Sequence, residues 1–220
     1  MADTNITIGL RRNMVEDLDR KLQSLGFTHF SSILEVMRQI PRHQFAPMGF
    51  ESIAYEINPV LIDEDQTMSS PLTVAIQTLV LNPQPSDKIL EIGTGSGYQA
   101  SVLSKLCREV YTLERHQILY EKAKTFFKEQ KMRNVFPFLK DGFEGLEIQA
   151  PFDKIIITCG ASEMPEKLLA QLKVQGEMLI PMDTDGEQYM KRIIKLNEEE
   201  IYEENLGEFQ FVPMLKGINK

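Results

Sequence analysis

The sequence predicts an α/β fold in which a doubly wound, largely parallel sheet is preceded by helices and ends in an antiparallel hairpin. Three observations support this prediction. Short apolar runs alternate with segments of helical period between residues 88 and 181, a glycine-rich turn follows the first run, and the tail holds apolar runs with no helix between them. Alternating strands and helices are typical of a parallel sheet covered by helices.

Length, composition and charge limit the kind of protein. The chain has 220 residues, 42% of them hydrophobic and 25% charged, so we expect one domain over residues 1–220 with a sizeable core. The net charge of −8 disfavours nucleic acid and anionic membranes, which both require cationic surfaces. No segment approaches the ~20 apolar residues of a membrane-spanning helix. Cys107 and Cys159 lie in apolar neighbourhoods and cannot form a disulfide framework, so we expect a cytoplasmic protein with reduced thiols.

The first 70 residues predict helices and a long loop in front of the core over residues 71–220. From Leu10 to Gly26 apolar residues recur at helical spacing, and the glycine is a C-terminal stop. A serine of the Ser31–Ser32 pair is expected to cap a second helix, which Pro41 ends. Residues 41–68 follow neither period and are interpreted as an ordered loop, after which a third helix begins at Pro71.

The core predicts five strands with helices between most of them. The strands are expected over residues 88–92, 109–113, 135–139, 154–158 and 177–181. The helices are expected over residues 97–107, 116–131 and 164–173, with a further short helix around 143–148. The tail runs over residues 188–196, 201–206 and 208–213, with an acidic turn at Glu198–Glu200. We expect these tail runs to form an antiparallel hairpin that completes the sheet.

The segment KILEIGTGSGYQA, residues 88–100, is the strongest local signal for a ligand site. Three glycines follow the strand at alternate positions, Gly93, Gly95 and Gly97. Glycine permits positive φ and close approach of the backbone to a ligand, and the next helix presents unpaired amides. A dinucleotide fingerprint would need glycine where Tyr98 stands. The pattern therefore favours S-adenosylmethionine, with Glu91 facing its ammonium group and the glycine amides beside its carboxylate and ribose; a purely structural turn is the alternative.

Acidic residues also follow the next two strands. Glu114 is placed to accept from both ribose hydroxyls, as an acid does in nicotinamide-binding proteins too. Asp141 is placed to accept from the adenine amino group, and Gly142 to let the backbone pack near the ring. The alternatives are a solvated acid and a simple turn. All should lie with Glu91 along one carboxyl edge of the sheet.

Several further blocks lie between about residues 30 and 217 with a characteristic order and spacing. They are IPRHQFAP, QTMSSP, ILEIGTGSGYQA, PFDKIIIT, the segment Gln171–Pro181 and FVPM. Together they resemble the protein-L-isoaspartate O-methyltransferase family. The resemblance implies a class I S-adenosylmethionine-dependent methyltransferase with a Rossmann-like, seven-stranded sheet. It also implies S-adenosylmethionine as methyl donor, S-adenosylhomocysteine as product, and L-isoaspartyl residues of damaged proteins and peptides as acceptors, whose methylation starts repair to aspartate.

By position, the resemblance places the catalytic serine at Ser69 and adds Gln66, Thr67, Met68 and Ser69 to the cofactor-binding residues. An α-carboxylate with a pKa near ~3.3 to 3.7 is already ionised at neutral pH, so methyl transfer needs alignment and exclusion of water, not a general base. A hydroxyl donor can hold one carboxylate oxygen and leave the other free to attack. The alternative role of this serine is to cap the helix at residue 71, which Ser70 could do instead.

The loop departs from the pattern of the family at four positions. Ile57 replaces an aspartate and Leu61 a proline, while Asp63 and Asp65 replace glycines. We expect the added carboxylates to weaken binding of an anionic acceptor. A class I methyltransferase with another acceptor, and a cofactor-binding homologue without catalysis, therefore stay open. The three histidines show no metal-ligand spacing, so no metal is expected, and the oligomeric state is open, with a monomer compatible.

Overall fold

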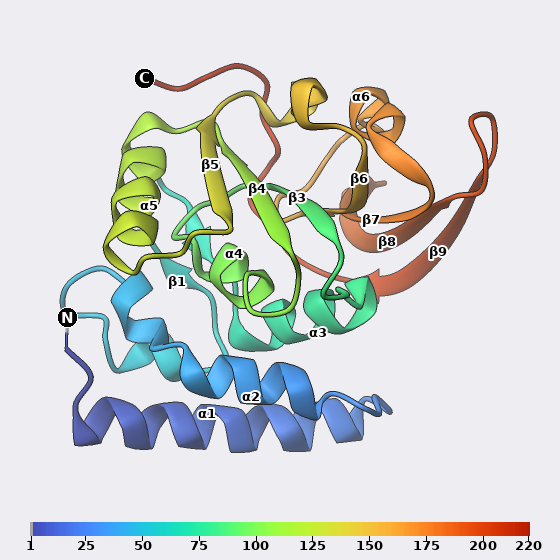
Figure 1. Ribbon diagram of the computed structural model, residues 1–220. Helices are drawn as coiled ribbons and strands as arrows, with labels where there is room; N and C mark the ends of the chain where they lie inside the picture. Colours follow the sequence, from blue (N-terminus) through green and yellow to red (C-terminus); the bar gives the residue numbers. More distant parts are fainter. Residues whose placement is uncertain (1) are drawn as a thin grey trace.

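The computed structural model describes residues 2–220 and confirms the predicted α/β class (Figure 1). Seven strands form one sheet in the order β5-β4-β3-β6-β7-β8-β9. Their bounds are β3 (Lys88–Ile92), β4 (Glu109–Glu114), β5 (Val135–Leu139), β6 (Phe152–Ile157), β7 (Leu172–Thr184), β8 (Glu187–Lys195) and β9 (Ile201–Glu208). The pairs from β5 to β7 are parallel, and β8 pairs antiparallel with both β7 and β9. The predicted antiparallel end of the sheet is therefore confirmed.

Helices cover both faces of this sheet. Their bounds are α1 (Asn5–Ser24), α2 (Ser31–Gln39), α3 (Pro71–Leu81), α4 (Tyr98–Leu103), α5 (Gln117–Glu129) and α6 (Glu166–Ala170). In β3, Ile89 packs in one cluster with Leu81 of α3 and Phe127 of α5, whereas Leu90 packs in another with Leu168 of α6. Both faces of this central strand are thus buried, as is usual for parallel sheets.

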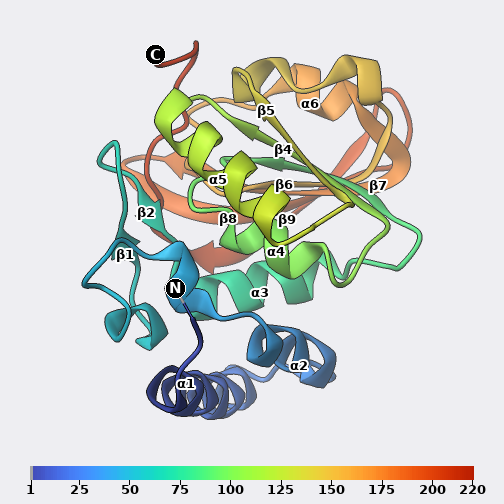
Figure 2. The ribbon, with the colours of Figure 1, turned by 60° about the vertical axis from the view of Figure 1, so that its left-hand side comes forward.

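The two N-terminal helices form an outer layer beyond α3 and α4 (Figure 2). One apolar cluster joins them to the core, because Met14 of α1 and Met37 of α2 share it with Ala75 of α3 and Tyr98 of α4. This shared cluster supports a single domain in which residues 1–70 are added to a core over residues 71–220. That domain organisation stays a prediction.

Two predicted helix starts were wrong. The first helix begins at Asn5, because the Thr4 side chain accepts from the Thr7 amide (3.2 Å) and the Thr7 hydroxyl accepts from the Thr4 amide (2.8 Å). This reciprocal cap uses threonine where glutamate or glutamine is usual, so the pattern was missed. Neither Ser31 nor Ser32 caps the second helix, whose N-cap is Phe30 without a side-chain hydrogen bond.

The long loop predicted over residues 41–68 has structure of its own. It contains the 3-10 turns η1 (Arg42–Phe45) and η2 (Ile53–Tyr55) and a small hairpin of β1 (Val60–Leu61) and β2 (Thr67–Met68). Between the two strands, Glu64 and Asp65 have φ of 60° and 54°. Strands of two residues leave no period in the sequence, so this hairpin was not predicted.

Two other predicted elements, a third tail strand and a short helix, differ in the structure. Residues 208–213 do not form a third tail strand beyond the end of β9, and only an isolated bridge joins Gly160 to Pro213. The short helix expected around residues 143–148 consists of the 3-10 turns η3 (Gly142–Glu144) and η4 (Glu147–Gln149). Within residues 2–220, none of the helices has the length and apolar character needed to cross a membrane.

Candidate active site

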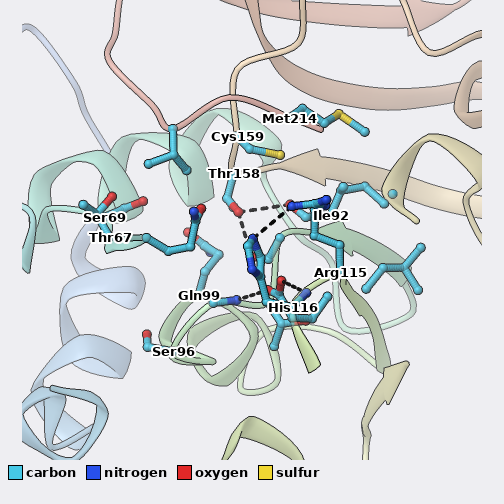
Figure 3. Close-up of a pocket in the computed structure, with 18 of the residues that line it drawn as sticks. Thr67, Ser69, Ile92, Ser96, Gln99, Arg115, His116, Thr158, Cys159 and Met214 are labelled. Atoms are coloured by element: carbon cyan, nitrogen blue, oxygen red, sulfur yellow. Dashed lines mark hydrogen bonds between the residues drawn. The ribbon is translucent and has the colours of Figure 1, made fainter. Parts of the chain in front are cut away.

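An open cavity lies at the carboxyl ends of the central strands (Figure 3). Six segments line it together with Val74 of α3. They are Gln66–Ser69, residues 92–96 with Tyr98 and Gln99, residues 113–116, Lys140 with Gly142, Thr158–Cys159, and residues 212–215. The cavity therefore joins the predicted cofactor segments to the segment that contains Ser69, as a doubly wound sheet places ligands outside the carboxyl ends of its strands.

The glycine turn needs its glycines for backbone shape and for space. Gly93 has φ of 93°, and a Cβ there would lie 2.5 Å from Thr158 Oγ1. Gly97 has φ of 86°, and a Cβ there would lie 2.8 Å from Phe127 of α5. Gly93 and Gly95 line the cavity, whereas Gly97 does not and serves the close packing of the turn on α5.

Glu114 lines the cavity and also holds the turn beside it. Its Oε2 accepts from the Gly95 amide (2.8 Å) and its Oε1 from the His116 amide (2.9 Å). A carboxylate has about four acceptor positions, so each oxygen can accept one further hydrogen bond from a ligand hydroxyl. The residue is thus preorganised for the two ribose hydroxyls predicted as its partners.

Glu91 lies beneath the glycine turn and does not line the cavity. Its side chain is fully buried, Thr112 Oγ1 donates to its Oε2, and its Oε1 has no hydrogen-bond partner among residues 2–220. Burial, opposed by the Thr112 hydrogen bond, raises the pKa of Glu91 to about 8. The side chain is therefore a neutral acid at pH 7 outside the cavity lining, and its predicted contact with a ligand ammonium group stays a prediction.

Replacing Glu91 with glutamine is expected to remove a pH-dependent loss of stability. Because the pKa in the folded protein is raised from 4.5 to about 8, the stabilisation from this group is fully present below pH 4.5 and is lost as the pH rises through about 8. A pKa difference of one corresponds to ~1.4 kcal/mol, so the effect should reach a few kcal/mol. Thermal melts between about pH 5 and pH 9 should show the wild type falling relative to the variant. Parallel curves would contradict the raised pKa.

Asp141 does not line the cavity, although its neighbours Lys140 and Gly142 do. Its Oδ1 accepts from the Phe143 amide (2.9 Å) as the cap of η3, and its Oδ2 accepts from the Gly217 amide in the tail (2.6 Å). In the structure this acid therefore ties the C-terminal tail to the end of β5. Its predicted contact with the adenine amino group stays a prediction.

Ser70, not Ser69, caps α3. Its Oγ accepts from the Thr73 amide (3.1 Å), and Pro71 occupies the first turn, where its missing amide hydrogen costs nothing. Ser69 lines the cavity with Gln66, Thr67 and Met68. In Figure 3, Thr67 and Ser69 lie on the side of the pocket away from Arg115. The hydroxyl of Ser69 is thus not required for the helix that follows it.

The acidic loop residues dock the small hairpin onto the rest of the site. Asp63 forms an ion pair with Lys122 of α5 (2.7 Å), and Glu64 Oε2 accepts from Asn219 Nδ2 in the tail (3.2 Å). Glu64 also lies 3.4 Å from His116 Nδ1. The Asp63 carboxylate therefore faces a cation, which reduces the repulsion of an anionic acceptor expected from the sequence.

The C-terminal tail forms one wall of the cavity. Its backbone pairs with Gly160, because the Gly160 amide donates to Val212 O (2.8 Å) and the Met214 amide donates to Gly160 O (2.7 Å). Gln188 Oε1 accepts from the Phe211 amide (2.7 Å), and a Cβ on Gly160 would lie 2.3 Å from the Gln188 side chain. A side chain at Gly160 would therefore displace the Gln188 side chain that binds the tail.

Several cavity residues were not predicted. Gln99, on the first turn of α4, donates from Nε2 to Thr78 Oγ1 (3.0 Å), and its Oε1 is buried without a partner in the described part of the chain. Its place one residue after Tyr98, directly behind the glycine turn, was a usable signal. Cys159 also lines the cavity, and burial raises its thiol pKa to about 12, so the thiol is neutral. Residues 2–220 contain no group of three or more His, Cys, Asp or Glu side chains that could hold a metal ion.

Comparisons with known proteins show which family the chain resembles along its length. The profile of the family described as Protein-L-isoaspartate(D-aspartate) O-methyltransferase matches residues 13–219. A relative from Flavobacterium johnsoniae, named Protein-L-isoaspartate O-methyltransferase, is 41% identical over 219 residues, with 100% of both chains covered. A relative of the same name from Dictyoglomus thermophilum is 43% identical over 208 residues, covering 94% of this chain and 91% of the other.

Solved structures extend the similarity to the whole fold. A Plasmodium falciparum protein, described as a protein-L-isoaspartate O-methyltransferase in complex with S-adenosyl-L-homocysteine, superposes with a TM-score of 0.81 at 25% identity. The match covers 94% of this chain and 99% of that one. The fold is therefore that of the S-adenosylmethionine-dependent methyltransferases, and the chain belongs to the protein-L-isoaspartate(D-aspartate) O-methyltransferase family.

Proposed function

We propose that the protein transfers a methyl group from S-adenosylmethionine to the α-carboxylate of L-isoaspartyl residues in damaged proteins and peptides. Methylation is then the first step of their repair to aspartate. The observation that carries this proposal is one cavity that joins the glycine turn and Glu114 to Ser69. The resemblance of the whole chain to the family supports the same activity.

The residues of the cavity fit this cofactor. Gln99 lines the cavity with a buried Oε1 that lacks a partner within residues 2–220, and a ligand ammonium group would supply the donor. Glu91 lies outside the cavity lining, and its predicted contact with the ammonium group is kept as part of the proposal. Glu114 retains acceptor positions for two ribose hydroxyls, and the Gly142 backbone can pack against an adenine because no side chain intervenes. When bound, S-adenosylmethionine would supply the electrophilic methyl group on its sulfonium sulfur.

Ser69 is proposed to orient the acceptor. Its hydroxyl donates to one oxygen of the ionised carboxylate, which leaves the other oxygen free for attack in line with the methyl carbon and the sulfur. Because the carboxylate is already ionised, the residues around it would need to move no proton, and Ser69 would serve only to hold and orient it. The tail wall over residues 212–215 and the segment Gln66–Ser69 enclose this space and help to exclude water.

The proposal also covers the substrates, partners and location of the protein. Substrates are proteins and peptides that contain isoaspartyl residues, with no nucleic acid or membrane as partner, and the oligomeric state stays open, with a monomer compatible. A cytoplasmic location suits the two free thiols of Cys107 and Cys159, since a reducing compartment keeps thiols unpaired.

A methyl-transfer assay with labelled S-adenosylmethionine tests the function. The acceptors are an isoaspartyl peptide and the same peptide with a normal aspartyl residue. We expect transfer to the first and none above background to the second, since only the first presents the α-carboxylate beside an extra backbone methylene. Transfer to neither peptide by a protein that binds S-adenosylhomocysteine would contradict the proposal and indicate another acceptor or a non-catalytic homologue.

A further inference from the structure

Arg42, in η1, is a fully buried arginine with 0% exposure. Its guanidinium donates from Nε to the Ala54 carbonyl (2.7 Å) and from Nη2 to the Ser69 carbonyl (2.6 Å). Both acceptors are backbone atoms of the loop between α2 and α3. One side chain therefore ties η1, η2 and the segment that carries Ser69 to each other.

The guanidinium is held by carbonyl groups and an aromatic ring. No carboxylate lies within ion-pair distance of it among residues 2–220, and burial lowers its pKa to about 10, which leaves it protonated at neutral pH. Its Cζ lies 4.4 Å from the ring centroid of Tyr98, a fully buried residue that lines the cavity at the start of α4. Burying a cation without a counter-ion costs desolvation free energy, and an apolar residue at the same position would stabilise the fold at least as well.

Ser69 is consequently fixed from two directions. On one side its carbonyl is bound by Arg42, and on the other Ser70 and Pro71 set the start of α3 through the cap on Thr73. The position of the Ser69 side chain depends on this backbone, because no hydrogen bond of its hydroxyl to the described residues is present to orient it.

We propose that Arg42 is a positioning residue for methyl transfer, holding the Ser69 backbone so that its hydroxyl meets the acceptor carboxylate. The role rests on the proposed function, because it acts through Ser69. It predicts that changes at Arg42 alter the transfer step and leave cofactor binding nearly intact, since the hydrogen bonds of Arg42 go to Ala54 and Ser69 and not to the glycine turn or Glu114.

A double-mutant cycle tests the role. Arg42→Lys keeps the positive charge, but a single ammonium nitrogen does not reproduce the geometry of the two hydrogen bonds to the Ala54 and Ser69 carbonyls. We expect kcat for an isoaspartyl peptide to fall ~10-fold in Arg42→Lys, but only about twofold when the same change is made in the Ser69→Ala background, because residues that act through one another are not additive. The dissociation constant of S-adenosylhomocysteine should stay within about twofold of the wild type by calorimetry.

Arg192→Lys is the control. Arg192 of β8 is a half-buried arginine whose ion pairs are with Glu177 of β7 (3.1 Å) and Glu204 of β9 (3.3 Å), both on the sheet and not on the loop that carries Ser69. The Arg192 variant should lower the melting temperature without changing kcat. Arg42→Gln is a second variant, which keeps one donor and leaves no buried cation, and it should follow Arg42→Lys in kcat.

The outcomes separate the inference from the function. Three results would overturn the role of Arg42 while leaving the proposed function in place. They are equal losses of kcat in both backgrounds, an unchanged kcat with only a lower melting temperature, and a loss of folding in both Arg42 variants. A folded wild-type protein that transfers no methyl group to the isoaspartyl peptide would overturn the proposed function, and the role of Arg42 with it.

Discussion

Replacing Ser69 with alanine is expected to lower methyl transfer by ~10- to 100-fold while the affinity for S-adenosylhomocysteine stays nearly unchanged. A hydrogen bond to a charged group contributes ~1.5 to 3 kcal/mol, and ~1.4 kcal/mol is a factor of ten in rate. Ser69 lines the cavity and does not cap α3, so its removal should spare the fold. The measurement is steady-state kinetics with an isoaspartyl peptide, with calorimetry for the cofactor product.

Ser70→Ala is the matched control for this prediction. Ser70 caps α3 through the Thr73 amide, so its loss should cost about 1 kcal/mol of stability with little effect on transfer. If Ser69→Ala is fully active, or if Ser70→Ala alone loses activity in a folded protein, the assignment of Ser69 as the catalytic serine is wrong.

Replacing Glu114 with alanine is expected to weaken binding of S-adenosylhomocysteine by ~100-fold or more. The carboxylate is placed for two ligand hydroxyls and also accepts from the amides of Gly95 and His116, so the variant loses ligand contacts and the shape of the turn together. Charge-assisted hydrogen bonds are worth ~1.5 to 3 kcal/mol each, so two of them exceed a factor of 100. Isothermal titration calorimetry measures the change directly.

Glu109→Ala provides the comparison within the same strand. Glu109 begins β4 at the opposite end from Glu114 and forms an ion pair with its neighbour Arg108. The Glu109 variant should bind like the wild type. Wild-type affinity in Glu114→Ala would show that the end of β4 does not hold the ribose.

Sequence periodicity predicted the sheet because the central strands β3, β4 and β6 are buried on both faces and the helices are separated by turn residues. Strands β3 and β5 have the predicted bounds, whereas β7 extends over Leu172–Thr184 because its ends pair with β6 and β8 beyond the apolar run. Such extensions depend on neighbouring strands and are not visible in the apolar pattern alone.

The site was predictable where its chemistry is local. The glycine turn and Glu114 lie within a strand–turn–helix–strand unit, and their spacing alone indicated a ligand. Asp141 was harder to place, because one of its oxygens is bound by Gly217, which is 76 residues away. Arg42 likewise contacts Ser69 across 27 residues, a pairing that only the folded loop brings about.

One acidic loop residue has a basic partner that lies far away in the sequence. Two carboxylates in place of glycines suggested repulsion of an anionic acceptor, but α5 supplies Lys122 opposite Asp63. The left-handed backbone at Asp65, with φ of 54°, is a conformation that glycine adopts more easily. The replacement of glycine there is compatible with the turn because aspartate tolerates this region better than most residues.

The most direct test of the cofactor pocket is a crystal structure of the protein with S-adenosylhomocysteine. The arrangement described above predicts the ligand in the cavity, with its ribose hydroxyls on Glu114, its adenine beside Gly142 and its sulfur facing the side of Ser69. A ligand bound elsewhere, or an empty cavity at a saturating concentration of S-adenosylhomocysteine, would contradict it.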